Sequence, residues 1–206
     1  MSVRLYNKHM NVLFLDIASH NGIVACCTED KILASEQCDT RISDNELVPL
    51  IEKVLKDSGL SYDQLTHVAC ITGPGGFTSL RVAVSCANTI ADQIKIPSAG
   101  VHMSDYYKAR TEESDVLWLH STKKNVLFMR GGKWKESTHI ELDKFLKEAP
   151  KKAKWMGELI EEHKLEIERL DFEEVILTDT ENVLPEFLSS LQYKSELLEP
   201  WYGRNG

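Results

Sequence analysis

Short hydrophobic runs separated by polar turns dominate the first forty positions of this chain. Apolar runs rich in β-branched residues predict three strands, at residues 12–16, 23–28 and 32–38. The Asn21-Gly22 pair and the charged residues 29–31 are typical of tight turns between paired strands. We therefore expect three sequential antiparallel strands.

The hydrophobic spacing then changes to the three-to-four-residue period of a helix. Ser43 and Glu46 form a capping-box pattern, and Gly59 is placed to end the helix. Pro49 removes one backbone hydrogen bond, so a bend is expected in the first turns. The apolar positions that define this helix are Leu47, Leu50, Ile51, Val54 and Leu55.

The rest of the chain divides into a clear part and a coarser part. Up to residue 101 the pattern predicts a strand at 67–72, a glycine corner at 73–76, a helix from 77 to about 95 and a strand at 98–101. The order is βββαβαβ, a mixed sheet with two helices. Later segments predict a hairpin over 116–119 and 126–129 that continues into GGKWKEST, helices at 142–146, 155–170 and 184–191, and a strand at 175–177. We expect an N-terminal extension at 1–10, a first lobe at 11–101 and a smaller second lobe at 102–206.

The helix that follows the glycine corner has an unusual composition. Between Val82 and Ala91 it contains no charged residue. A helix that covers one face of a sheet needs only a single apolar stripe about 100° wide. Two interpretations remain open: the helix is enclosed in the core of this chain, or another protein covers its outer side.

The glycine corner itself also has two interpretations. Backbone amides at the start of a helix can bind an anion, whereas glycines at such a corner can serve only to permit a sharp turn. No Lys-Ser/Thr pair follows Gly76, and Thr78 stands where a dinucleotide fingerprint has its last glycine. The turn-forming interpretation is therefore favoured over a phosphate site.

Composition narrows the classes of function. The 206 residues carry a net charge of −8, divided as −3 up to Val101 and −5 beyond it, so neither half has the basic surface that phosphate backbones require. No apolar run approaches the 18 residues that a membrane helix needs. Five cysteines in apolar segments without a C-x-x-C pair indicate buried thiols in a reducing cytoplasm.

Candidate catalytic chemistry is sparse. The seven histidines include no pair on one helical turn, and no serine lies in a G-x-S-x-G motif. Asp16 at the end of the first strand could hold a magnesium ion, but a single aspartate there is more often a turn residue. We expect no catalytic residue, no cofactor and no metal.

The motif loop of residues 73–81 resembles the G-P-G-S-F-T-G-L-R pattern of the TsaB (YeaZ) family. It reads Gly73, Pro74, Gly75, Gly76, Phe77, Thr78, Ser79, Leu80 and Arg81. Residues 13–19 resemble the opening strand of that family, residues 44–49 its H-S-E-x-L-x-P helix motif, and residues 200–204 its C-terminal motif. The likeness is specific over about residues 11–101 and looser afterwards.

The resemblance implies an actin/Hsp70-like (ASKHA) α/β fold and a non-catalytic subunit. Its function would be to bind and activate TsaD in the formation of N6-threonylcarbamoyladenosine on tRNA, with the ATPase TsaE as a further partner and no tRNA binding by the isolated chain. The first two helices of each subunit would form the heterodimer. The expected contact residues are Val48, Ile51, Leu55, Val82, Ser85, Cys86, Thr89 and Gln93.

Two alternatives belong to other classes. An actin-like nucleotide phosphotransferase would use Asp16 and the glycine corner, but it would also need a second phosphate loop, for which Gly131-Gly132 is a poor candidate. A homodimeric structural protein would pair the second helix with its own copy, and a self-complementary helix looks the same in sequence.

Overall fold

Two five-stranded sheets with flanking helices make up the fold. The computed structural model describes residues 9–38, 42 and 44–203, so Ser43 of the expected capping box lies outside the described residues. In the first sheet the strand order is β3-β2-β1-β4-β5. Its strands are β1 (Val12–Asp16), β2 (Gly22–Cys27), β3 (Ile32–Cys38), β4 (His67–Gly73) and β5 (Ser98–His102). The first three are antiparallel, and β4 and β5 continue the sheet in parallel with β1.

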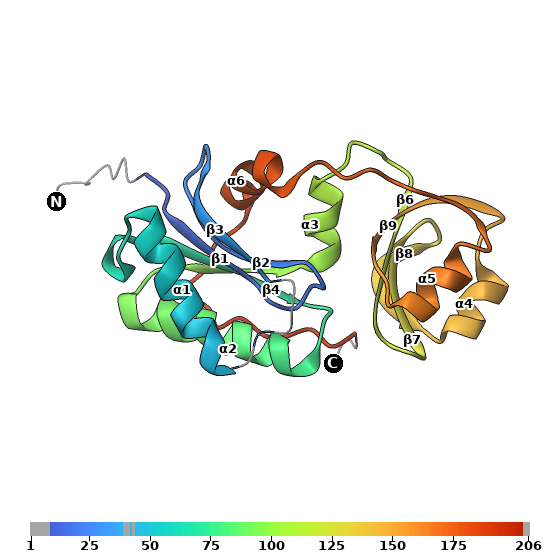
Figure 1. The fold of residues 1–206 in the computed structure, drawn as a ribbon, viewed down its shortest axis with the longest axis horizontal. Helices are drawn as coiled ribbons and strands as arrows, with labels where there is room; N and C mark the ends of the chain where they lie inside the picture. Colours follow the sequence, from blue (N-terminus) through green and yellow to red (C-terminus); the bar gives the residue numbers. More distant parts are fainter. Residues whose placement is uncertain (1–8, 39–41, 43, 204–206) are drawn as a thin grey trace.

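Helices cover both faces of this first sheet (Figure 1). One face carries α1 (Asp44–Ser58) and α2 (Phe77–Ile94), and the other carries α3 (Met103–Ala109) and α6 (Thr180–Ser190). A short 3-10 turn, η1 (Tyr62–Gln64), precedes β4. Gly59 follows α1 with a φ of 73°, in the left-handed region that ends helices, as expected.

The second sheet repeats the plan of the first. Its order is β10-β9-β6-β7-β8, with β6, β7 and β8 antiparallel and β9 and β10 added in parallel. The elements are β6 (Val116–Lys123), β7 (Val126–Gly131), β8 (Trp134–Ile140), α4 (Leu142–Glu148), β9 (Lys152–Glu158), α5 (Glu161–Ile167) and β10 (Asp171–Glu174). Both halves therefore follow the succession βββαβαβ and end in a helix, which confirms the expected actin-like α/β fold.

Three expectations for the second half are wrong. Residues 155–170 form no single helix, because β9 ends at Glu158 and α5 begins at Glu161. The last strand lies at 171–174 instead of 175–177, and α6 begins at Thr180, so Pro185 lies inside it. The buried pair Trp155 and Met156 explains the first error: β9 is covered on both faces and shows no strand alternation.

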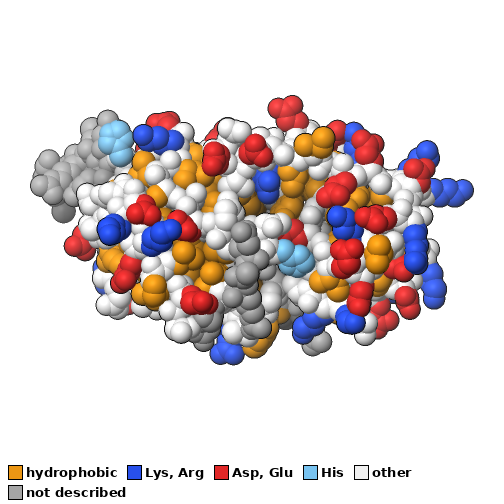
Figure 2. Space-filling view, viewed as in Figure 1, with side chains coloured by type: hydrophobic (Ala, Val, Ile, Leu, Met, Phe, Trp, Pro, Cys, Tyr) orange, Lys and Arg blue, Asp and Glu red, His pale blue; other side chains and the backbone are white. Residues whose placement is uncertain are grey.

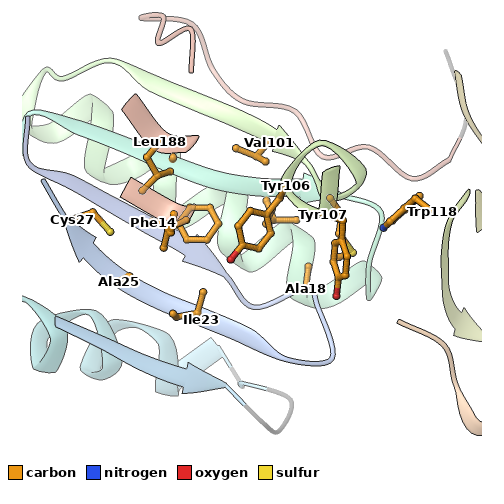
Figure 3. Close-up of a cluster of buried hydrophobic side chains, with 14 of the residues drawn as sticks. Phe14, Ala18, Ile23, Ala25, Cys27, Val101, Tyr106, Tyr107, Trp118 and Leu188 are labelled. Atoms are coloured by element: carbon orange, nitrogen blue, oxygen red, sulfur yellow. The ribbon is translucent and has the colours of Figure 1, made fainter. Parts of the chain in front are cut away.

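A shared core lies between the sheets. Phe14 and Ile71 of the first sheet, Tyr106 of α3 and Trp118 of the second sheet belong to one cluster of buried side chains. In Figure 3, Phe14, Tyr106 and Tyr107 lie in a row above the first sheet, with Trp118 beyond them. This cluster fixes how the second sheet lies against α3.

The C-terminal segment at residues 194–201 returns to the first sheet. Lys194 forms an antiparallel bridge with Ser98, and the Trp201 amide donates to the Thr72 carbonyl at 2.7 Å. The division at residue 101 remains a prediction, and within its second half both α6 and this C-terminal segment lie against the first sheet. Among the described residues, no helix is long and apolar enough to span a bilayer.

Candidate functional site

The outward face of α2 is the candidate site. On its inner side this 18-residue helix packs Leu80, Ala83, Val84 and Ala87 onto the sheet. The neutral stretch from Val82 to Ala91 is thus not enclosed in the core. Its outer side is part of the protein surface.

Five expected contact residues lie on that outer side. Ser85, Thr89 and Gln93 are exposed, and Val82 and Cys86 are half-buried at the junction with α1. The Thr89 hydroxyl donates to the Ser85 backbone carbonyl oxygen at 2.8 Å, so this hydrogen bond is formed within α2. Ile90, four residues after Cys86, is also half-buried here; its spacing from Val82 and Cys86 indicates its place, although it was absent from the expected set.

On α1 the structure separates the three expected residues. Val48 is 48% exposed and lies on the outer side, whereas Ile51 and Leu55 are buried on the side that packs on the sheet. Ile51 and Leu55 are therefore not part of the exposed surface. We define the outer α1–α2 face as Val48, Val82, Ser85, Cys86, Thr89, Ile90 and Gln93.

Charged groups lie at the ends of this face. Arg81 places its guanidinium 5.3 Å from the centre of the exposed Phe77 ring at the start of α2. At the other end, Lys95 is paired with Asp92 at 2.9 Å. The α2 part of this face is neutral between these groups, whereas α1 carries the exposed charged residues Glu52 and Lys53 in the turn after Val48. A neutral helix surface of this kind is typical of one that a protein covers.

The glycine corner is held by tight packing. Its motif residues Gly73, Pro74, Gly75 and Gly76 lead from β4 into α2, with a cis bond between the first two, and Thr78 is exposed in the first turn. A side chain at Gly73 would collide with the Trp201 backbone, and Gly73 has a φ of 152°. Gly75 lies directly against Ala18 of the β1–β2 turn. This packing supports the turn-forming interpretation.

Replacing Gly75 by alanine is expected to destabilise the fold. The new Cβ would lie 2.7 Å from the Ala18 Cβ and 2.9 Å from the Ala18 carbonyl oxygen, so the β1–β2 turn has to shift. We expect a loss of about 1–3 kcal/mol in the free energy of unfolding, measured by urea titration. Gly76→Ala is the matched control, because its Cβ meets nothing closer than the Ser79 hydroxyl at 3.5 Å. Equal losses in the two variants would contradict this account of the corner.

The Asp16 side chain forms its hydrogen bonds within the β1–β2 turn. Its Oδ1 accepts hydrogen bonds from the backbone amides of Ala18 and Ser19 at 3.1 and 3.0 Å, and its Oδ2 accepts from the Ser19 hydroxyl. Burial raises the pKa of Asp16 from 3.8 to about 6. Within the described residues, no group of three His, Cys, Asp or Glu side chains is arranged to hold a metal ion.

The thiols are unreactive in this arrangement. Cys26, Cys27, Cys38 and Cys70 are buried, and Cys86 is half-buried. Burial raises the pKa of Cys26 to about 11 and that of Cys27 to about 12, which keeps both as neutral thiols. The four buried cysteines act as small core side chains, as expected, whereas Cys86 reaches the outer α1–α2 face.

Comparison with known proteins links this arrangement to one family. A family model described as TsaD, tRNA N6-adenosine threonylcarbamoyltransferase, matches residues 40–184. The tRNA threonylcarbamoyladenosine biosynthesis protein TsaB of Buchnera aphidicola subsp. Acyrthosiphon pisum (strain APS) is 29% identical over 111 residues, covering 52% of this chain and 50% of that protein. TsaB of Escherichia coli (strain K12) is 27% identical over 92 residues, covering 45% of this chain and 40% of that protein. The matches thus span about half the length, or less, of these curated relatives.

Solved structures agree over almost the whole chain. A crystal structure of an uncharacterized protein with similarity to peptidase YEAZ, from Pseudomonas aeruginosa, superposes with a TM-score of 0.69 at 18% identity, covering 95% of this chain and 100% of that one. A structure of YeaZ from the same organism gives a TM-score of 0.67 at 16% identity, covering 94% and 99%. At these identities the likeness is one of fold.

Proposed function

This chain belongs to the family of the TsaD model and is a member of the TsaB (YeaZ) family, and from that premise we propose that it is a non-catalytic subunit acting in tRNA threonylcarbamoyladenosine formation. In this proposal it binds and activates TsaD, the catalytic subunit, through the outer α1–α2 face. The ATPase TsaE is the further partner.

One observation carries the proposal: α2 contacts the sheet and, at Asn88, the C-terminal segment, yet its exposed outer side has no charged residue from Val82 to Ala91. A surface helix normally presents charged side chains to water. Half-buried Val82 and Cys86, together with Val48 of α1, instead provide an apolar centre rimmed by hydroxyl and amide groups. That pattern is typical of the core and rim of a protein–protein interface.

A homologous partner fits this geometry. The model that matches this chain describes TsaD itself, so the two subunits are expected to share the element succession that precedes α2. Equivalent helix pairs can then pack against each other across a pseudo-twofold axis, as identical ones do in symmetric dimers.

Three features support a non-catalytic role. Both Asp16 oxygens accept hydrogen bonds within their own turn, so this carboxylate is not directed at a substrate. The buried thiols are held in the protonated form, which is not nucleophilic. The net charge of −8 also opposes tRNA binding by the isolated chain, and Figure 2 shows acidic and basic side chains interspersed on the displayed face. The proposed location is the cytoplasm.

Thr89→Arg tests the proposed interface. Thr89 is exposed and its hydroxyl bonds only within α2, so the variant is expected to fold normally. A charged side chain buried against an apolar partner surface should weaken TsaD binding at least a hundredfold, or about 2.7 kcal/mol, in calorimetry with the purified subunits. Threonylcarbamoylation of tRNA by the mixed subunits should fall in parallel.

Ser189→Arg on α6 is the matched control. Its hydroxyl also bonds to a carbonyl of its own helix, but α6 lies on the opposite face of the sheet. The control should bind TsaD as the unchanged protein does. Full binding of TsaD by Thr89→Arg would refute the proposed interface.

The alternative, a homodimer of this chain, is tested by sedimentation of the protein without TsaD. If the homodimer uses the outer α1–α2 face, it should dissociate in the Thr89→Arg variant.

A further inference from the structure

The turn between β1 and β2 directs four successive backbone amides at carboxylates. The amides of Ala18 and Ser19 donate to Asp16, at the end of β1. The next two amides, of His20 and Asn21, donate to Glu158 at 2.7 and 3.1 Å. Consecutive amides that converge in this way form a cradle for an anion.

Glu158 reaches this cradle from the other sheet. It is the last residue of β9, is 7% exposed, and uses one carboxylate oxygen for each of the two amides. The Asn21 side-chain amide adds a third hydrogen bond at 3.3 Å. The carboxylate therefore joins the β1–β2 turn to the second sheet.

The Glu158 carboxylate is paired with the dipoles of N–H groups and not with a cationic side chain. His120 lies 3.9 Å away, but burial lowers the pKa of its ring to about 3, so it is neutral and forms no ion pair. Among residues 9–38, 42 and 44–203, no lysine or arginine nitrogen lies within 4.0 Å of Glu158. Backbone amides aimed at a buried carboxylate take the place of a cation.

A second contact holds the same turn. The His20 ring nitrogen Nε2 lies 3.0 Å from the Ser121 carbonyl oxygen of β6. The Ser121 hydroxyl in turn accepts from the Ile160 amide at 3.0 Å, just beyond Glu158. Behind these bonds, the Trp118 and His120 rings are stacked with centroids 5.8 Å apart. Glu158, Ser121 and the His20 ring thus lie on the side of the cradle that faces the second sheet.

We propose that Glu158 is a built-in anionic ligand of the β1–β2 turn, which joins the two sheets and excludes external anions of the phosphate class from that turn. In this proposal Glu158 holds the two sheets in the observed arrangement, and no bound ligand is needed between them. This inference does not depend on the proposed partner, because the outer α1–α2 face lies on the far side of the first sheet.

Glu158→Ala and Glu158→Gln test it, with Glu161→Gln as the control. Glu161 is an exposed carboxylate three residues further on. Hydrogen exchange of the His20 and Asn21 amides should be at least tenfold faster in Glu158→Ala, and unchanged in the control. Inorganic phosphate, titrated while amide NMR shifts are recorded, should move these two signals saturably in Glu158→Ala and leave them in place in the unchanged protein. Glu158→Gln retains one acceptor oxygen, so its exchange should be intermediate.

Three results would overturn the proposal. They are phosphate binding at these amides in the unchanged protein, slow exchange that persists in Glu158→Ala, and fast exchange in that variant without phosphate binding. If Glu158→Ala does not fold, Glu158→Gln decides through hydrogen exchange alone, because its side chain still fills the turn but has lost the charge and one acceptor oxygen. Unchanged protection of the His20 and Asn21 amides in Glu158→Gln would then overturn the proposal.

Discussion

Replacing Trp118 by alanine is expected to lower the free energy of unfolding by about 3–5 kcal/mol. Trp118 is 1% exposed and is among the largest fully buried side chains. Its ring contacts His102 at the end of β5 and stacks on His120 of its own strand. Truncation would leave a cavity between the sheets, which the surrounding backbone cannot close.

Equilibrium urea unfolding gives the measurement, and Phe77→Ala is the control. Phe77 is a large aromatic residue of the same protein, but it is 56% exposed, so its loss should cost less than about 1 kcal/mol. We also expect the variant Trp118→Ala to unfold over a broader range, because the two sheets then lose their common core. Similar losses for Phe77 and Trp118 would contradict the role assigned to the shared cluster.

Asp16→Asn is expected to stabilise the protein at high pH. Burial, the largest cause, raises the pKa of Asp16 from 3.8 to about 6, so the folded state binds this proton more tightly than the unfolded state does. The stability contributed by protonation is complete below pH 3.8 and is lost as the pH rises through 6. That rise in pKa corresponds to roughly 3 kcal/mol. Asparagine is neutral throughout and avoids this loss.

The measurement compares unfolding free energies of the two proteins between pH 4 and pH 8. The difference should shift in favour of Asp16→Asn by about 2–3 kcal/mol over that range. The asparagine oxygen can still accept from the Ala18 and Ser19 amides, and its amide can donate to the Ser19 hydroxyl. Asp30→Asn, at an exposed turn, controls for the change in net charge. A difference that does not vary with pH would refute the burial effect at Asp16.

Much of the first half of the fold was predictable because its signals are local. Gly59 ends α1, and the glycine corner separates β4 from α2, each through a backbone conformation that favours glycine. The second half was harder to predict. Both faces of β9 are covered, and β10 is a short edge strand made mostly of acidic residues. Neither strand therefore shows an alternation of hydrophobic and polar residues.

The neutral surface of α2 was predictable, because the sequence from Val82 to Ala91 contains no charged residue. That a partner covers this surface stays a proposal. The orientation of α1 depends on how it packs on the sheet, which is why the sequence did not show that Ile51 and Leu55 are buried. Glu158 had no signal in the sequence, because its partners lie 137 and 138 positions away.

The return of the C-terminal segment to the first sheet has a consequence for biosynthesis. The Leu198 amide donates to the Asn88 side chain, and the Trp201 amide donates to Thr72, across separations of more than a hundred residues. Such non-local pairings form late and slow the folding of a chain. Residues 194–201 are synthesised after every strand of the second sheet, so the first sheet to be synthesised is completed only after the second.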